Sequence, residues 1–199
     1  MPTAGKHPIR WDWLADGRRF YEQRGYRYVE VPWLVHPNVT EVTHSDGVGG
    51  FACALSDLVG SGEQGFLQMM LNGDLPLGRY QTITPCFRDE MLDDLHHTHF
   101  MKLELIDTAI DSEDPVGDII NDADQFAAQL LQRNGPWSGS IWSRVHRNQI
   151  DMLYGPERVE LGSYGVREHN GLRWVYGTGI AEPRWSCILD GKDNILLVR

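Results

Sequence analysis

The stretch GRYQTITPCFRDEMLDDLHHTHFMKLE, residues 78–104, decides the fold of this chain. Read as two antiparallel strands joined by a short polar loop, it places Arg88 and Glu90 before the loop. Phe100 and Glu104 follow the loop on the second strand. One hairpin then carries a fixed cation, a hydrogen-bond acceptor and an aromatic plate. Because such a set can hold a phosphate and an adenine ring together, the stretch predicts a nucleotide site on a β-hairpin.

The chain before this hairpin predicts a helix followed by a strand. Asp12 is the expected N-cap of the helix, and Gly25 ends it. Aromatic and β-branched residues over 26–35 predict a strand, interrupted by Pro32, which belongs at a sheet edge or an interface. The glycines and short polar residues of 36–65 predict a loop-rich region that covers a substrate.

The chain after the hairpin predicts one long helix and several strands. Apolar residues between Val116 and Leu131 recur at steps of three and four, which predicts a helix over residues 113–133. Asn170-Gly171 predicts a tight hairpin turn. The other expected elements are a helix over 65–71, strands over 100–109, 150–154, 158–166 and 172–177, and a last helix from 182 or 183 to 189. Together they predict an α+β fold, an antiparallel β-sheet flanked by helices, as a single domain over residues 1–199.

The composition bounds the class of protein. Of 199 residues, 41% are hydrophobic and 23% charged, which is ordinary for a soluble globular domain. The sequence shows no apolar run that would span a bilayer, no secretory signal at its start and no metal-binding spacing among its three cysteines. We therefore expect a cytoplasmic protein without a membrane partner. The net charge of −10 argues against nucleic acid as a partner, because nucleic-acid binding relies on basic surfaces.

Three stretches together resemble the class II aminoacyl-tRNA synthetases. The hairpin stretch closely resembles motif 2 of that family, and its spacing from Phe87-Arg88 to Glu104 is that of the phenylalanyl enzymes. FYEQRGYRYVEVP, residues 20–32, resembles motif 1, which builds the dimer interface of the family. VYGTGIAEPRWSCIL, residues 175–189, resembles motif 3 most nearly in its seryl form, although Pro183 displaces the glutamate of that motif. The resemblance covers nearly the whole chain, with the motifs in the family order.

The resemblance implies that the site binds ATP. Arg88 would bridge the carboxylate of the acid and the α-phosphate, and Arg184 would be the second catalytic arginine. Phe100 and Arg184 would sandwich adenine, while Glu90 accepts a hydrogen bond from the adenine amino group. The other implied ATP contacts are His96, Glu160, Ser163 and Gly179.

The resemblance also implies a magnesium ion and a subsite for the acid. Magnesium is expected at Glu104 and Glu160, because Mg²⁺ prefers one or two carboxylates plus phosphate oxygens. The implied substrate-binding residues are Glu63, Gln64, Gln81 and Tyr164. Alternatives stay open for three groups: Glu63 and Gln64 as caps of the following helix, Glu160 as an exposed strand carboxylate, and the histidines of residues 96–99 as phosphate contacts, metal ligands or a solvated loop.

The function implied by the resemblance is that of a ligase. It would activate an amino acid, or a similar small carboxylic acid, with ATP to an acyl-adenylate and pass the acyl group to an acceptor. We expect no anticodon-binding domain in this length, so the acceptor would be a protein or a small molecule and not a full tRNA. The alternative is a non-catalytic regulatory or ligand-binding paralogue. The motif 1 region implies a homodimer, while the identities of the acid and the acceptor do not follow from the sequence.

Overall fold

The computed structural model describes residues 8–43, 49–89, 95–134, 141–146, 149–155 and 158–190, of which 141, 142, 144–146, 189 and 190 are described by their backbone alone. The helices are α1 Trp11–Glu22, α2 Pro37–Thr43, α3 Gly62–Asn72, α4 Pro115–Asn134 and α5 Arg184–Asp190. The strands are β1 Arg27–Tyr28, β2 Leu34–Val35, β3 Phe51–Cys53, β4 Ser56–Leu58, β5 Arg79–Phe87, β6 His99–Asp107, β7 Ile141–His146, β8 Gln149–Tyr154, β9 Val159–His169 and β10 Leu172–Glu182. The predicted α+β fold is confirmed.

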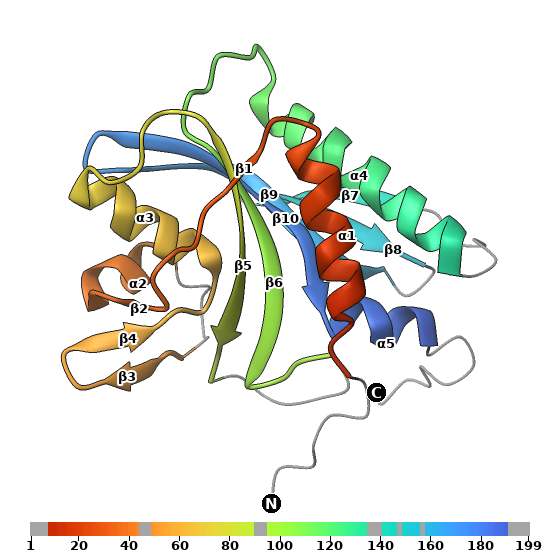
Figure 1. Ribbon diagram of the computed structural model, residues 1–199, viewed down its shortest axis with the longest axis horizontal. Coiled ribbons are helices and arrows are strands. Elements are labelled where there is room, and N and C mark those ends of the chain that lie inside the picture. Colours follow the sequence, from red (N-terminus) through yellow and green to blue (C-terminus); the bar gives the residue numbers. More distant parts are fainter. Residues whose placement is uncertain are drawn as a thin grey trace, which may run out of the picture.

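A seven-stranded sheet organises the described part of the chain, in the order β1-β5-β6-β10-β9-β8-β7. Every neighbouring pair is antiparallel except β1 and β5, which run parallel, so the sheet is mixed and not purely antiparallel as expected. The hairpin expected over residues 78–104 is formed by β5 and β6, with Arg79 opposite Asp107 and Phe87 opposite His99. The two strands of the hairpin are therefore the second and third in the order of the sheet, between β1 and β10 (Figure 1).

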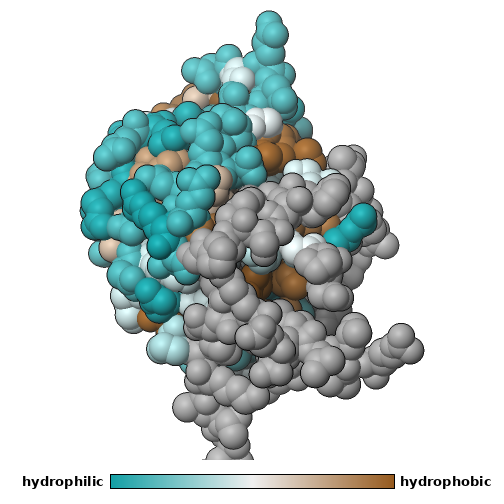
Figure 2. Space-filling model, turned by 90° about the vertical axis from the view of Figure 1, so that its right-hand side faces the viewer, coloured by the Kyte–Doolittle hydropathy of each residue, from teal (hydrophilic) through white to brown (hydrophobic). Residues whose placement is uncertain are grey.

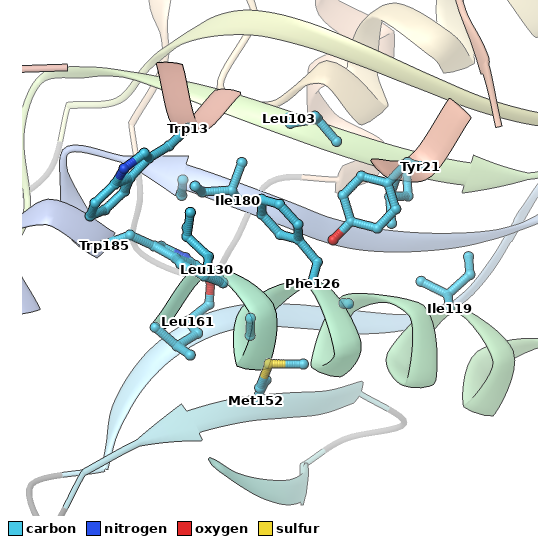
Figure 3. Close-up of a cluster of buried hydrophobic side chains, with 14 of the residues drawn as sticks. Trp13, Tyr21, Leu103, Ile119, Phe126, Leu130, Met152, Leu161, Ile180 and Trp185 are labelled. Atoms are coloured by element: carbon cyan, nitrogen blue, oxygen red, sulfur yellow. The ribbon is translucent and has the colours of Figure 1, made fainter. Parts of the chain in front are cut away.

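One face of the sheet is covered by α1 and α4, as Figure 1 shows. The apolar stripe of α4 supplies Phe126 and Leu130 to a buried cluster that also contains Tyr21 of α1 and Trp185 of α5. In Figure 3 these side chains point toward one another between the long helix and the strands. The opposite, polar side of α4 is left to solvent, which agrees with the mostly hydrophilic surface seen on the described part of the face in Figure 2. The amphipathic pattern thus fixes which face of the helix packs on the sheet.

The other face of the sheet carries α3 and a smaller cluster of buried residues. Phe66 and Leu67 of α3 pack with Tyr80, Ile106 and Trp174 from the sheet. Because Ile106 belongs to this cluster while Leu105 belongs to the α1–α4 cluster, successive residues of β6 point to opposite faces. Among the described residues, no helix has the length and apolar character needed to cross a membrane.

Two segments differ from their expected structure. Residues 26–35 do not form one strand: β1 joins the large sheet, and β2 pairs with β4 in a separate three-stranded sheet. Pro32 lies between them and removes a backbone donor there, which is consistent with a break in the ladder. The expected loop over 36–65 contains α2, the β3–β4 hairpin and the first turn of α3. Short elements of this kind lack the repeating apolar pattern on which the expectation relied.

The ends of the elements agree in part with the sequence. Arg10 and not Asp12 is the N-cap of α1; Asp12 lies in the first turn, 3.0 Å from the Arg10 guanidinium. At this position a carboxylate is still stabilised by the helix dipole. The turn at Asn170-Gly171 is confirmed, since both residues have positive φ, 50° and 76°, and they join β9 to β10.

Candidate functional site

A cavity of about 240 Å³ lies where β6, β8, β9 and β10 meet the start of α3. Its lining residues are mostly polar, and they come from segments far apart in the sequence. They are Thr43, Ser61, Glu63, Arg88, His96, Phe100, Lys102, Glu104, Gln149, Glu160, Leu161, Gly162, Ser163, Arg167, Tyr176, Thr178, Ala181 and Arg184. The structure therefore brings eight of the residues expected at the site to one place: Glu63, Arg88, His96, Phe100, Glu104, Glu160, Ser163 and Arg184.

Arg88 and Phe100 form a platform at one end of the cavity. The guanidinium carbon of Arg88 lies 5.1 Å from the centroid of the Phe100 ring, within the range of a cation–π contact. The Arg88 Nε donates to the carbonyl of Gly60 at 3.0 Å, and its backbone N–H donates to Thr98 at 3.0 Å. These contacts fix the arginine, and within the described part of the chain its terminal nitrogens are not held by another residue and can meet an anion. An aromatic face beside a fixed cation suits a base next to a phosphate.

Arg184 and Glu160 form a second charged pair in the same cavity. Arg184 is the first residue of α5, and its Nη1 lies 3.4 Å from Glu160 Oε1. Glu160 is 40% exposed, so its carboxylate is open to the cavity. Ser163 donates to Glu160 Oε1 or to Asp151 Oδ1, at 3.2 and 3.0 Å, because one hydroxyl has one proton to share. The serine therefore couples the half-exposed carboxylate to a buried one.

A β-bulge in β9 brings Glu160 and Ser163 to one face of the sheet. Gly162 pairs with Met152 and Glu160 with the next residue, Leu153, which leaves Leu161 as the extra residue. In a regular strand, two residues three apart point to opposite faces. The bulge reverses the alternation once, so both side chains reach the cavity.

Glu63 lines the cavity at the start of α3. It is buried, and its Oε1 accepts a hydrogen bond of 2.7 Å from the indole N–H of Trp174. The Nε of Arg167 lies 3.1 Å from the same oxygen. Burial raises the pKa of Glu63, an effect that the neighbouring Arg167 opposes. The expectation that Glu63 faces a substrate is consistent with its place in the cavity lining, although the side chain also has firm partners within the protein.

Glu104 and Lys102 form a buried ion pair on β6. The Nζ of Lys102 lies 2.7 Å from Glu104 Oε1, and the backbone N–H of Gly62 donates to Glu104 Oε2 at 2.7 Å. Both oxygens of Glu104 thus accept bonds from the protein, and the carboxylate holds the first turn of α3 against the sheet. This arrangement differs from the expected magnesium ligand, because the carboxylate is already neutralised by an ammonium group.

Gln64 and Gln81 do not line the cavity, in contrast to the expectation. Gln64 accepts a hydrogen bond of 2.7 Å from the backbone N–H of Gly60 and so ties the helix start to the preceding loop. Gln81 is fully buried, and its amide donates to the carbonyls of Arg18 and Tyr26, both at 3.0 Å. Each glutamine side chain therefore forms hydrogen bonds with backbone groups. For Gln64 this agrees with the alternative role of capping the helix that follows.

Tyr164 and Gly179 also face away from the cavity. Tyr164 is the neighbour of Ser163 on β9, and consecutive strand residues point to opposite faces. Its hydroxyl donates to the carbonyl of Thr178 at 2.8 Å from within the core. A Cβ placed on Gly179 would lie 2.4 Å from Leu103 Cδ2, so this glycine permits close packing of the core side and not the approach of a nucleotide to that side. The expectation for Gly179 came from the motif 3 resemblance and that for Tyr164 from its polar aromatic side chain, and neither residue is among those that line the cavity.

Some expected features fall outside the described residues or stay untested. Glu90, the expected adenine contact, lies outside the described residues. His96 lines the cavity, and Thr98 and His99 are linked by a side-chain contact of 3.3 Å. Among the described residues, no group of three or more His, Cys, Asp or Glu side chains is arranged to hold a metal ion. The displaced motif 3 glutamate, Glu182, is fully buried and accepts hydrogen bonds from Ser186 and from the backbone of Arg10.

Lys102, Arg167 and Thr43 are among the lining residues that the sequence did not predict. Lys102 lies two residues from both Phe100 and Glu104, so strand alternation alone would have placed it on their face. Arg167 follows Ser163 by four residues on β9, so strand alternation places it on the same face as Ser163. Thr43 is different: its hydroxyl is buried without a hydrogen-bond partner among the described residues, and no local pattern identifies the end of α2 as part of the site.

A family model described as tRNA synthetases class II (D, K and N) matches residues 8–136 of the chain. That range includes α1, the β5–β6 hairpin and α4, and it carries Glu63, Arg88 and Phe100. No curated protein sequence matches the chain significantly.

Solved structures of tRNA synthetases superpose on this fold. A pyrrolysyl-tRNA synthetase from Desulfitobacterium hafniense does so with a TM-score of 0.66 and 16% identity, over 93% of this chain and 68% of that one. Another structure of the pyrrolysyl enzyme from this organism gives 0.64 and 17%, over 91% and 69%. A cytoplasmic serine-tRNA ligase from Naegleria fowleri, solved in complex with AMP, gives 0.62 and 15%, over 88% and 52%. At these identities the likeness concerns the fold alone.

Proposed function

The chain belongs to the class II tRNA synthetase family (D, K and N), and on that basis we propose that it activates an amino acid, or a similar small carboxylic acid, with ATP. The product is an acyl-adenylate, and the acyl group then passes to an acceptor other than a full tRNA. One observation carries the proposal: the Arg88–Phe100 platform and the buried carboxylate of Glu63 line the same cavity. A nucleotide and an ammonium-bearing acid therefore have complementary groups at its two ends.

The nucleotide is assigned to the end of the cavity that contains Arg88, Phe100 and Arg184. Adenine stacks on the Phe100 ring, and the two arginines meet the phosphates and the second face of the base. His96 lines this end as well and is a further phosphate contact. The serine-tRNA ligase of similar fold was solved in complex with AMP, which supports a nucleotide site in this architecture.

The reaction joins two anions, so the protein's main task is to screen charge and align the reactants. A carboxylate oxygen of the acid attacks the α-phosphorus of ATP, and the bond between that phosphorus and the bridging oxygen to the β-phosphate breaks. Pyrophosphate leaves with the electron pair, and a mixed anhydride remains. The nucleophile is already ionised, so no residue has to act as a general base. Arg88 stabilises the charge that develops on the α-phosphate.

Glu63 is assigned to the α-amino group of the acid. The two protein contacts of this carboxylate that the structure describes, from Trp174 and Arg167, both use Oε1. An ammonium group bound at Oε2 would complete the coordination of the carboxylate. Thr43 and Arg167 line the same end of the cavity and are placed to contact the rest of the acid. A charged and polar lining of this kind favours a polar acid over an aliphatic one.

Magnesium, which ATP chemistry in this family implies, fits Glu160 better than Glu104. The Glu160 carboxylate is 40% exposed in the cavity, whereas both oxygens of Glu104 are bound by Lys102 and Gly62. Glu160 would therefore be the protein carboxylate that holds the ion, with phosphate oxygens supplying further ligands. When bound, the ion neutralises phosphate charge. Its loss is expected to abolish activity while the protein stays folded.

The surface charge and the exposed apolar side chains support proposals for the acceptor and the assembly. The net charge of −10 disfavours a long polyanion, which supports a protein or small-molecule acceptor. Trp33 and Leu34, next to the motif 1 segment, are 55% and 48% exposed. Because large apolar side chains that cluster at a surface mark interaction sites, we assign the homodimer interface to this region. The cytoplasm is the proposed compartment, since it keeps free thiols such as Cys53 reduced.

Amino-acid-dependent exchange of pyrophosphate into ATP tests the proposal. The twenty standard amino acids are assayed with the wild-type protein and with Arg88→Ala. Exchange with one acid, reduced at least 100-fold in the variant, is expected from the loss of a fixed cation at the α-phosphate. The absence of both exchange and nucleotide binding in folded wild-type protein would sink the assignment. Nucleotide binding without exchange would point to a non-standard acid, which a wider panel of carboxylic acids then tests.

A further inference from the structure

Lys102 lies midway along the cavity on β6. Phe100, Lys102 and Glu104 all line the cavity and are spaced two residues apart, so each step along the strand is about 7 Å. Phe100 belongs to the nucleotide end, and Glu104 is bound to the first turn of α3, where Glu63 begins the acid end. The ammonium group of Lys102 therefore stands between the two ends, where the carboxylate and the α-phosphate must meet.

Two short contacts in series fix the position of the Lys102 ammonium group. Gly62 N–H holds Glu104 Oε2 at 2.7 Å, and Glu104 Oε1 in turn holds Lys102 Nζ at 2.7 Å. The Lys102 side chain is 12% exposed and that of Glu104 is 2% exposed. An ammonium group has three donors, of which this pair uses one, so the others can reach a ligand without breaking it. A lysine held in this way is preorganised as a donor.

The neighbouring strands leave room beside Lys102. Its partner across β10 is Ala181, which lines the cavity, and its partner across β5 is the buried Thr84. Ala181 is on this face because Gly179 forms a bulge: Thr178 pairs with Glu104, and Ile180 pairs with Leu103. A small side chain is thereby set opposite the ammonium, at the point where a phosphate would lie.

A purely structural role would not explain this pair well. Burying two charges costs desolvation energy that their attraction rarely exceeds, so a buried ion pair is weak evidence for stability alone. Apolar side chains would close this part of the sheet at least as well. The pair lies instead on the wall of the cavity, where a neutral unit with an available ammonium can bind an anion.

We propose that Lys102 is a further catalytic cation of adenylate formation, beside Arg88 and Arg184, with Glu104 as its positioning residue. This inference rests on the proposed function. The Lys102 ammonium binds a non-bridging oxygen of the α-phosphate and the attacking carboxylate oxygen. It screens their repulsion as the new oxygen–phosphorus bond forms and the bond to pyrophosphate breaks. No proton is transferred in this step, so the lysine keeps its charge throughout.

The test compares four proteins: wild type, Lys102→Met, the double variant Lys102→Met/Glu104→Gln, and Arg173→Met. The last removes an exposed cation from β10 and serves as the matched control. In pyrophosphate exchange, both Lys102 variants are expected to lose about 100-fold in kcat/KM, as when a preorganised donor is removed. Arg173→Met is expected to match the wild type. A loss of activity in Lys102→Met could come from the missing cation or from the Glu104 carboxylate that is left unpaired. The double variant separates these two explanations, because it also removes the charge of Glu104.

A binding measurement supplies a readout that needs no turnover. By calorimetry, Lys102→Met is expected to weaken AMP binding about tenfold and leave adenosine binding unchanged, because the lysine meets only the phosphate. Recovery of exchange in the double variant would assign the loss to the unpaired Glu104 and overturn the proposal. Exchange within fivefold of wild type in Lys102→Met would overturn it as well. Wild-type protein that binds AMP without any exchange would instead count against the proposed function, with the AMP-to-adenosine comparison still deciding the place of Lys102.

Discussion

The indole N–H of Trp174 on β10 donates to the carboxylate of Glu63 on α3 at 2.7 Å, although the two residues are 111 positions apart in the chain. Together with the contact from Arg167, this bond sets the direction of the buried carboxylate. It also stabilises the charged form of Glu63, against the burial that raises its pKa. The acid end of the cavity therefore depends on a strand that is distant in sequence.

Trp174→Phe is expected to weaken binding of the acid and leave AMP binding unchanged. The variant removes the hydrogen bond and keeps most of the apolar volume, so the pKa of Glu63 rises further. Because a protonated Glu63 cannot pair with an ammonium group, the KM for the acid should increase several-fold, and more so as the pH falls. Exchange kinetics between pH 5.5 and about 8 would measure this. A parallel shift of the AMP affinity would show instead that the whole cavity had rearranged.

Phe100→Leu is expected to weaken AMP binding about tenfold, since stacking of a base on an aromatic ring contributes roughly 1–3 kcal/mol. Leucine keeps an apolar side chain at the position that pairs with Cys86 across the hairpin but has no face for adenine or for Arg88. Calorimetric titration with AMP is the measurement, and inorganic pyrophosphate serves as a ligand without a base. An unchanged affinity for AMP would place the nucleotide elsewhere in the cavity.

The buried carboxyl of Glu182 predicts a pH dependence of stability. Burial raises its pKa from 4.5 to about 7, an effect that hydrogen bonds from Ser186 and Arg10 oppose. The folded protein therefore binds the proton more tightly than the unfolded chain does, and the free energy of unfolding falls as the pH rises from about 4.5 to about 7. Above that range the loss is complete, at about 3 kcal/mol.

Glu182→Gln should flatten this part of the stability curve. The amide cannot ionise, so the difference between its unfolding free energy at pH 5 and at pH 7.5 is expected to be smaller than in the wild type by about 2 kcal/mol. Urea titrations at the two pH values give both quantities. The absolute stability of the variant is less informative, because the amide nitrogen cannot accept the Arg10 N–H. Equal slopes in both proteins would show that other groups cause the pH dependence.

Gly179→Ala is expected to destabilise the protein by about 1–3 kcal/mol through overpacking. A Cβ at this position would lie 2.4 Å from Leu103 Cδ2 and 3.2 Å from the Leu103 carbonyl oxygen. The side chain of Leu103 can yield only into a filled core, and the backbone cannot yield without disturbing the β6–β10 ladder. Thermal unfolding would detect the change. A variant with the stability of the wild type would mean that the bulge has more freedom than its contacts indicate.

Trp33→Asp is expected to abolish self-association if the motif 1 region forms the homodimer interface. The side chain is 55% exposed, so the substitution should change the unfolding free energy of the monomer by less than about 1 kcal/mol. Sedimentation velocity at several protein concentrations would give the oligomeric state of both proteins. The same substitution at Leu77, which is 76% exposed, provides the control at a site away from this region.

The sequence predicted the β5–β6 hairpin and α4 because each rests on a local pattern, and the residues proposed for the nucleotide end lie largely on that hairpin. Arg88 and Phe100 are separated by a short loop, and their meeting follows from pairing the two strands. Strand alternation would also have placed Lys102 with Phe100, but an isolated lysine on a strand has no signature of its own. The two-residue period of the strand therefore contains the information that places Lys102 on the face of the cavity.

Other parts of the site depend on contacts that no local pattern contains. Thr43 reaches the cavity because α2 packs on α3, and Trp174 of β10 reaches Glu63 in the first turn of that helix. Gln81 and Tyr164 were expected at the site for their chemistry, yet each side chain satisfies backbone carbonyls within the core. Polar residues on a central strand can serve either face, and only the tertiary structure decides which one.

Each of the two bulges, at Leu161 and Gly179, adds one residue to its strand and so reverses which residues face the cavity. Before each bulge the even-numbered residues face the cavity, and after it the odd-numbered residues do. Removing a single residue there would shorten the strand very little, yet it would turn Glu160 or Ala181 to the opposite face. These segments should therefore accept changes of residue type far more readily than changes of length. The number of residues in each strand, as well as their identity, therefore determines which side chains reach the site.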